Sequence, residues 1–217
     1  MHSSLVRCDT LLLDMDGTLL DLAYDNYFWQ EAVPKAYANT HGLADDVAMH
    51  EVAQRIARER GTMNWYDLEF WSDALKIDVL ALKHACADRI AYLDGVTTFL
   101  QRMRDLHKRL VLVTNSSSAL LTLKHARTGV CDFMDAAYSS DQFGIPKEVE
   151  AFWPAFAAQE PFDPARTLLL DDSIAVLDAA SAYGIRVLGL TRPDSRYPAR
   201  SWASGHASVS SVIKLLG

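Results

Sequence analysis

Short apolar runs alternate with amphipathic stretches along most of this chain. The runs have the length of buried strands, and they occupy residues 10–14, 109–115, 136–140, 167–172 and 185–190. Apolar residues recur at helical spacing in the stretches between them, at residues 96–106, 118–127, 147–159 and 173–184. Strands that alternate with helices predict an α/β fold in which a parallel sheet is covered on both faces.

One long segment, residues 21–92, interrupts the alternation and contains no strand pattern. It contains helix-like stretches instead, with breaks near Gly42 and Gly61, at residues 24–39, 46–60, 65–74 and 78–90. We therefore expect a Rossmann-like α/β core of residues 1–20 and 93–217, with a helical domain of residues 21–92 inserted after the first strand. The tail from Thr191 is predicted to be loop, apart from a short helix near residues 209–216.

The composition is that of a soluble protein with a sizeable core. Apolar residues make up 50% of the 217 residues and charged residues 23%, which allows one large domain or a core with a smaller insert. The net charge of -7 argues against nucleic acid as a partner. Cys8, Cys86 and Cys131 lie too far apart to indicate a disulfide framework or a zinc site. Without a run of membrane-spanning length or a secretion signal, we expect a cytoplasmic protein with no membrane partner.

Polar residues that can carry out chemistry gather where the predicted strands end. In open α/β sheets, ligands bind at the carboxyl ends of the strands, so these residues are expected at one edge of the sheet. In chain order they are Asp14, Asp16, Thr114, Asn115, Lys147 (slightly beyond the third strand), Asp171 and Asp172.

This set of acids, a hydroxyl and an ammonium suits phosphoryl transfer assisted by a metal. Carboxylate oxygens favour Mg²⁺, which also reduces the repulsion between an attacking carboxylate and a phosphate. Asp14 can be the nucleophile that forms an aspartyl-phosphate, and Asp16, two residues on, can donate and accept a proton from the same side. Lys147 and Thr114 can hold the phosphoryl oxygens in the transition state.

Each of these residues also has an ordinary structural role. The acids at 171 and 172 can cap the helix that follows, and Lys147 can be a solvated lysine in the first turn of a helix. Ser116, Ser117 and Ser118 fit a helix cap better than a nucleophile, and the chain has no Gly-rich phosphate loop of the P-loop type. The order of the polar residues and their shared location favour the catalytic interpretation.

Four ordered motifs resemble those of the haloacid dehalogenase-like hydrolases. They are "DMDGTLLD" at 14–21, "LVTNSSS" at 112–118, "GIPK" at 144–147 and "LLLDDSIAVLDAASAYGI" at 168–185. Within that superfamily, the chain is similar to the bacterial GMP/IMP nucleotidases over almost its whole length. The segments that carry this similarity are "LLLDMDGTLLDLAYDNYFWQEAVPKAY", "GTMNWYDLEFWS", "FGIPKEVEAFW" and "TRPDS".

The resemblance implies a role for each matching residue. It implies that Asp14 is the nucleophile, that Asp16 is the general acid/base, and that Thr114 and Lys147 bind the phosphate. Asn115, next to Thr114, is a further candidate for binding the phosphate. The implied magnesium ligands are the Asp14 carboxylate, the Asp16 backbone carbonyl and the acids Asp171 and Asp172, with Asp172 favoured for direct contact. The chain departs from the related nucleotidases at residues 116–118, where they have a stretch with histidine and proline. This departure bears on the substrate rather than on the chemistry.

The helical insert would act as a cap that excludes water and selects the substrate. It is rich in aromatic residues, most of which are expected to build the core of the cap. Trp29 and Trp65, each close to an asparagine, Asn26 or Asn64, are candidates for stacking on a base and reading its edge.

We therefore expect a Mg²⁺-dependent phosphomonoester hydrolase that acts on a purine nucleoside 5′-monophosphate, GMP or IMP. The alternatives within the enzymes are a sugar-phosphate phosphatase and a phosphoglucomutase-like phosphotransferase. A dehalogenase would need neither Asp16 nor a magnesium site. A non-catalytic phosphate-binding module is a further alternative, against which the acid/base residue Asp16 argues.

Overall fold

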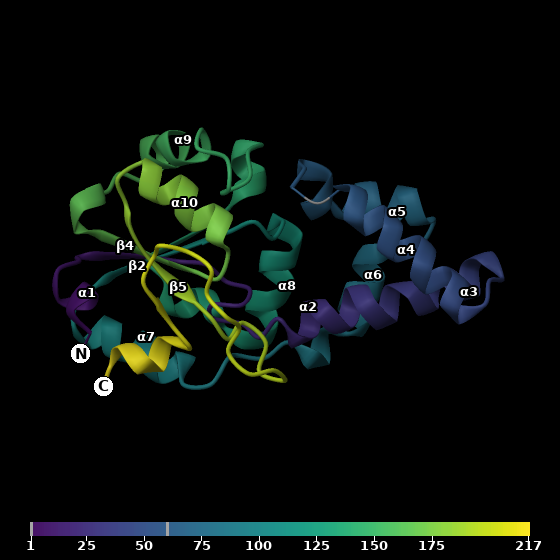
Figure 1. Ribbon diagram of the computed structural model, residues 1–217, viewed down its shortest axis with the longest axis horizontal. Helices are drawn as coiled ribbons and strands as arrows, with labels where there is room; N and C mark the ends of the chain where they lie inside the picture. Colours follow the sequence, from purple (N-terminus) through teal and green to yellow (C-terminus); the bar gives the residue numbers. More distant parts are fainter. Residues whose placement is uncertain (1, 60) are drawn as a thin grey trace. The chain divides into compact units, whose positions relative to one another are not determined.

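The computed structural model describes residues 2–59 and 61–217, which form two compact units (Figure 1). The first unit comprises residues 1–22 and 91–217, and the second comprises residues 23–90. The second unit therefore lies within the segment 21–92 in which the sequence shows no strand pattern. In the described part of the chain, no helix has the length and apolar character needed to cross a membrane.

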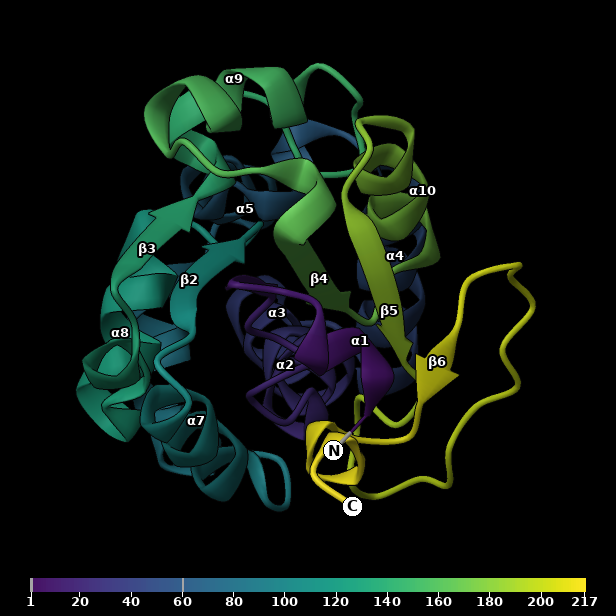
Figure 2. The same ribbon diagram turned by 90° about the vertical axis from the view of Figure 1, so that its left-hand side faces the viewer.

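The first unit is built on a six-stranded sheet in the order β3-β2-β1-β4-β5-β6, and every neighbouring pair of strands is parallel (Figure 2). The strands are β1 (Thr10–Leu13), β2 (Arg109–Thr114), β3 (Ala136–Ser139), β4 (Thr167–Asp171), β5 (Arg186–Leu190) and β6 (Ser208–Val209). The predicted α/β fold with a parallel sheet is thus confirmed. The strand order reverses at β1, which places its carboxyl end at the position where such sheets bind ligands.

Helices cover both faces of the sheet, with α9 and α10 on one side and α7 on the other (Figure 1). The principal helices of this unit are α7 (Val96–Asp105), α8 (Ser118–Thr128), α9 (Phe152–Gln159) and α10 (Ile174–Ala182). Successive strand side chains point to opposite faces. Leu12 and Leu169 therefore pack with Phe152, Trp153 and Phe156 of α9 in one buried cluster. Each fully buried side chain of this kind contributes about 1.5–3 kcal/mol.

Helix α9 begins later than the sequence pattern predicts. The pattern predicts a helix from residue 147, whereas residues 147–151 form turns and α9 starts at Phe152. The reason is that the backbone of Lys147 is bound from elsewhere in the fold. Its N–H donates to Asn115 Oδ1 at 2.9 Å, and its carbonyl accepts from Trp153 Nε1 at 3.1 Å. Lys147 is therefore held by tertiary hydrogen bonds outside any helix.

Short elements complete this unit. The predicted helix near residues 209–216 is present as a 3₁₀ turn, η7 (Val212–Leu215). The sequence pattern predicted neither α1 (Ser3–Val6) nor strand β6, whose two residues carry no apolar pattern. The remaining 3₁₀ turns are η4 (Val130–Phe133), η5 (Ser140–Phe143) and η6 (Pro164–Arg166).

The second unit is helical throughout its described residues. Its elements are α2 (Ala23–Tyr27), the π-helical η1 (Phe28–Ala32), α3 (Val33–His41), α4 (Asp45–Glu59), the 3₁₀ turn η2 (Met63–Tyr66), α5 (Leu68–Leu75), α6 (Val79–Ala85) and the 3₁₀ turn η3 (Ala87–Arg89). The helix predicted over 24–39 is thus continuous but contains a π segment. Pro34, which lacks an N–H group, is the second residue after that segment. The predicted end of the next helix, Arg60, lies outside the described residues.

Candidate active site

The carboxyl ends of β1 and β4 bring two acids together. The strands pair in register from Thr10 opposite Thr167 to Leu13 opposite Leu170, and the N–H of Asp14 donates to the Leu170 carbonyl at 3.0 Å. Asp14, directly after β1, therefore lies beside Asp171, the last residue of β4. Both side chains are buried, with Asp14 6% and Asp171 1% exposed.

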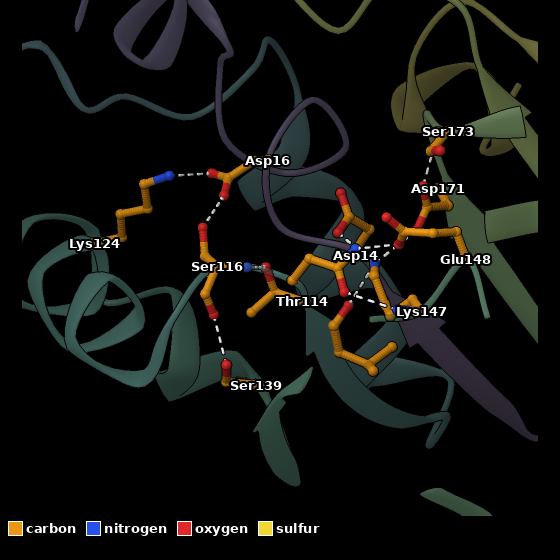
Figure 3. Close-up of polar contacts among 12 residues, drawn as sticks. Asp14, Asp16, Thr114, Ser116, Lys124, Ser139, Lys147, Glu148, Asp171 and Ser173 are labelled. Atoms are coloured by element: carbon orange, nitrogen blue, oxygen red, sulfur yellow. Dashed lines mark hydrogen bonds and ion pairs between the residues drawn. The ribbon is translucent and has the colours of Figure 1, made fainter. Parts of the chain in front are cut away.

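Lys147 bridges these two acids (Figure 3). Its Nζ lies 2.6 Å from Asp14 Oδ1 and 2.7 Å from Asp171 Oδ2, and it donates a third hydrogen bond to the Val113 carbonyl at 3.0 Å. All three ammonium protons thus have acceptors. Lys147 is 1% exposed, so it is a buried and fixed charge rather than a solvated lysine.

Asn115 helps to position this lysine. Its Oδ1 accepts from the Lys147 N–H, and its Nδ2 donates to Glu148 Oε2 at 2.7 Å. The side-chain amide therefore joins the end of β2 to the turn that contains Lys147. The sequence predicted Asn115 as a phosphate-binding residue. The two hydrogen bonds described here join its amide to the segment that carries Lys147, and phosphate binding by Asn115 stays a prediction.

A third acid completes the cluster. One carboxylate oxygen from each of Asp14, Asp171 and Asp172 lies within 4.8 Å of the other two. Both oxygens of Asp171 are engaged, Oδ2 by Lys147 and Oδ1 by the N–H of Ser173 at 2.8 Å. Asp172 Oδ2 lies 3.3 Å from the Arg200 guanidinium, which also donates to the Asp172 carbonyl. Asp172 therefore retains the freer carboxylate of the acidic pair.

Gly17 allows the chain after β1 to pass close to Asp172. Its φ is +84°, and a Cβ atom at this position would lie 2.9 Å from Asp172 Cγ and 2.9 Å from Pro193 Cβ. A side chain here would be strained in conformation and would also clash with its neighbours. The glycine of the "DGT" sequence is thus required by the packing of the acidic cluster.

The electrostatics of the cluster favour a divalent cation. Burial raises the pKa of Asp14 well above its ordinary value, with Asp171 and Asp172 adding to the effect and Lys147 opposing it. Burial, together with Asp171, raises the pKa of Asp172 to about 7 despite Arg200. Burial disfavours the Lys147 ammonium, but Asp14 and Asp171 outweigh this effect and raise its pKa. Asp14, Asp171 and the partly buried Asp172 carry three carboxylates, against the Lys147 ammonium and the Arg200 guanidinium. When all three acids are ionised, negative charge stays in excess, and hard oxygen donors with excess charge suit Mg²⁺.

Asp16 has different partners from those of Asp14. Its Oδ1 lies 2.6 Å from Lys124 Nζ, and its Oδ2 accepts a hydrogen bond from Ser116 Oγ at 2.7 Å (Figure 3). Because β1 ends at Leu13, the alternation of strand side chains does not extend to Asp16. The Asp16 side chain is not part of the three-acid cluster, and its side chain is 19% exposed.

Sequence reasoning missed Lys124 and assigned Ser116 a different role. Lys124 follows Leu120 by four residues on the buried face of α8, and a lysine at a core position was the available signal. Ser117, as predicted, caps α8 by accepting from the Leu120 N–H. Ser116 instead contacts Asp16, and its N–H donates to Thr114 Oγ1 at 3.0 Å. The Thr114 hydroxyl therefore keeps its own proton to donate.

The proposed base-binding residues lie in the second unit. The Trp29 ring packs edge-on against the rings of Phe28 and Trp71, at centroid distances of 5.1 and 5.3 Å. The Trp71 indole N–H donates to the Trp65 carbonyl at 3.1 Å. Both candidate tryptophans thus contact Trp71 within this unit, although each remains partly exposed. Of the two asparagines, Asn26 is half-buried in α2, and Asn64 donates to Glu59 at 3.0 Å.

Comparison with known proteins identifies the family. Residues 8–184 match the model of the haloacid dehalogenase-like hydrolases. The chain is 38% identical to the GMP/IMP nucleotidase YrfG of Escherichia coli K12, over 96% of this chain and 94% of that protein. It is 30% identical to an enolase-phosphatase E1 of Gluconacetobacter diazotrophicus, over 89% and 88% of the two chains.

A solved structure shares the fold. The crystal structure of a HAD phosphatase from Thermococcus onnurineus superimposes with a TM-score of 0.82 at 18% identity, over 95% of each chain. The family match and the fold agree with the motifs at the strand ends, and the resemblance inferred from the sequence is confirmed. This chain belongs to the haloacid dehalogenase-like hydrolase family.

Proposed function

We propose that this hydrolase is a Mg²⁺-dependent phosphomonoester phosphatase that acts through an aspartyl-phosphate on Asp14. The observation that carries the proposal is the buried Lys147 ammonium, held 2.6 Å from Asp14 and 2.7 Å from Asp171. It marks the place where a phosphoryl group meets both a nucleophile and a fixed positive charge. Lys147 occupies only Oδ1 of Asp14. Among the described residues, Oδ2 has no hydrogen-bond partner, which suits an attacking oxygen.

In the first half of the reaction, a carboxylate oxygen of Asp14 attacks phosphorus. The bond from phosphorus to the oxygen of the leaving alcohol breaks, and the protonated Asp16 carboxyl gives its proton to that oxygen. Lys147 and the Thr114 hydroxyl donate to the phosphoryl oxygens as charge moves across them. The products of this half are the free alcohol and phospho-Asp14.

In the second half, water hydrolyses phospho-Asp14. The Asp16 carboxylate accepts a proton from the water as its oxygen attacks phosphorus. The bond between phosphorus and the Asp14 oxygen breaks, so inorganic phosphate leaves, the Asp14 carboxylate is restored and Asp16 is again protonated. Both halves therefore use the same two acids in complementary states.

Magnesium would be held by the Asp14 carboxylate, the Asp16 backbone carbonyl and the acidic pair. Asp172 is the better direct ligand, because Lys147 and Ser173 already occupy both oxygens of Asp171. When bound, the ion reduces the repulsion between the Asp14 carboxylate and the phosphate. The raised pKa values of Asp14 and Asp172 fit a cluster that requires this added positive charge.

The substrate we propose is a purine nucleoside 5′-monophosphate. The support is the 38% identity to the Escherichia coli protein named GMP/IMP nucleotidase, across nearly the full length of both chains. In this proposal the helical unit of residues 23–90 is the substrate-selecting cap, with Trp29 or Trp65 stacking on the base and Asn26 or Asn64 reading its edge. Measured kcat/KM values for GMP, IMP, pyrimidine nucleotides and sugar phosphates test this assignment. A preference for sugar phosphates would be consistent with a phosphatase but would contradict the nucleotidase assignment.

The reaction itself is tested with Asp14→Asn. This variant should fold and lose turnover, and acid quenching of the wild type during turnover should trap a phosphoryl group on Asp14 that the variant lacks. Asp132→Asn, at an acid whose side chain is 77% exposed, is the matched control and should retain activity. Chelation should silence the wild type, and added magnesium should restore it. Normal turnover by Asp14→Asn would refute the covalent mechanism.

A further inference from the structure

Asp16 is held at both carboxylate oxygens by two side chains to which the family motifs assign no role. Lys124 Nζ lies 2.6 Å from Oδ1, and Ser116 Oγ donates to Oδ2 at 2.7 Å. We infer that Lys124 and Ser116 are positioning residues that orient Asp16 for proton transfer. This inference rests on the acid/base role proposed above for Asp16.

The burial of Lys124 shows that its charge is not incidental. The side chain is 1% exposed and lies on the inner face of α8, next to the buried Leu120 and Leu123. An ammonium group in such a place is costly unless it is paired, whereas a leucine or methionine would pack there without that cost. The ion pair with Asp16 supplies the compensation, so the position combines a core location with a charge directed at the second acid.

Ser116 is itself fixed by its backbone. Its N–H donates to Thr114 Oγ1 at 3.0 Å, and its carbonyl accepts from Ser139 Oγ at 2.7 Å. These contacts leave the Ser116 hydroxyl to meet Asp16. Ser116 therefore links Asp16, the proposed acid/base residue, to Thr114, which is proposed to bind the phosphate.

The two partners have different consequences for the proton. An ammonium group can only donate, so Lys124 occupies Oδ1 in both protonation states of Asp16. A serine hydroxyl both donates and accepts, so Ser116 can donate to the carboxylate and accept from the carboxylic acid. The transferred proton is therefore carried by Oδ2, on the Ser116 side, while Lys124 keeps the carboxyl group in one orientation.

Lys124→Met keeps an unbranched side chain of similar length and removes the charge. It tests this inference through the dependence of the rate on the leaving group. For GMP, whose leaving alcohol, guanosine, needs a proton from the acid, kcat/KM should fall roughly tenfold to a hundredfold, part of the range for losing an acid/base group. For p-nitrophenyl phosphate, whose leaving group needs no proton, kcat/KM should change little. Its kcat should still fall, with a burst of p-nitrophenol, because the base-assisted hydrolysis of phospho-Asp14 slows.

Lys124→Arg should restore part of the GMP activity, since it returns a donor and a charge. Ser116→Ala should give the same pattern as Lys124→Met with a smaller loss, and it provides a second test if Lys124→Met unfolds. Thr122→Ala, at an exposed residue of α8 whose hydroxyl bonds to the Ser118 carbonyl, is the control for damage to the helix. It should leave the ratio of the two kcat/KM values unchanged.

Asp16→Asn separates failure of this inference from failure of the proposed function. The leaving-group dependence is a larger loss of kcat/KM for GMP than for p-nitrophenyl phosphate. If Asp16→Asn lacks it, the acid/base role itself is wrong. If Asp16→Asn shows it and both Lys124→Met and Ser116→Ala lower kcat/KM equally for the two substrates, the positioning role is wrong. In the Asp16→Asn background, Lys124→Met should cause no further loss, because the two residues act as one unit. If the activity losses caused by Asp16→Asn and Lys124→Met multiply in the double variant, the inference is also wrong.

Discussion

Replacing Lys147 with methionine should destabilise the metal-free protein as well as lower its activity. The ammonium is 1% exposed and donates to Asp14, Asp171 and the Val113 carbonyl. Removing one partner of a buried ion pair costs about 3–5 kcal/mol, because the opposite charge stays buried. For a chain of this size, about 2–4 °C of Tm per kcal/mol corresponds to a loss of roughly 6–20 °C.

The assay is thermal denaturation with a chelator and with magnesium. Removal of Lys147 makes the cluster of Asp14, Asp171 and Asp172 more negative, so a divalent cation should bind more tightly and raise the Tm of Lys147→Met more than that of the wild type. Phosphate release should stay low even with saturating magnesium, since the donor to the phosphoryl oxygens is gone. Stability and catalysis should therefore respond differently to the metal.

Lys83→Met is the matched control. Lys83 is also 1% exposed and pairs with a carboxylate, Asp25 Oδ1, at 2.6 Å, but it belongs to the helical unit. In the presence of a chelator, Lys83→Met should have a lower Tm than the wild type. Magnesium should raise the Tm of Lys83→Met no more than it raises that of the wild type. Equal magnesium shifts in the wild type and both variants would refute the view that Lys147 balances the charge of the acidic cluster.

Three further predictions concern the acidic cluster and the proposed cap. Because the pKa of Asp172 is raised from 3.8 to about 7, the folded state binds more protons between these values. The metal-free protein should therefore lose stability as the pH rises through that window, and Asp172→Asn should show a smaller loss in denaturation measured from pH 4 to pH 8. Gly17→Ala should weaken magnesium-dependent stabilisation and cost about 1–3 kcal/mol. Gly42→Ala, which also has positive φ but open space around it, should cost only the conformational part and leave the metal response intact. Trp29→Ala or Trp65→Ala should lower kcat/KM for GMP by roughly tenfold to a hundredfold while sparing an aryl phosphate, and equal losses on both substrates would reduce the residue to a packing role.

Local patterns in the sequence determined the class of fold and the location of the chemistry. Continuous apolar runs of strand length, such as "LLL" before Asp14 and before Asp171, specify buried strands wherever they lie in the chain. The carboxyl ends of parallel strands share one edge of a sheet, so the acids at these ends were predictable as one group without coordinates. The family motifs then added a role for each.

Only the tertiary structure decided which side chains meet. Lys147 and Asp14 are separated by 133 positions, and Lys124 and Asp16 by 108, so no local periodicity records either pair. The same holds for the late start of α9, because tertiary hydrogen bonds hold the Lys147 backbone outside the helix that its sequence favours. Periodicity reports the face on which a residue lies. The partner of that residue depends on how distant segments pack. This packing buries the charge of Lys147 and pairs Lys124 with Asp16.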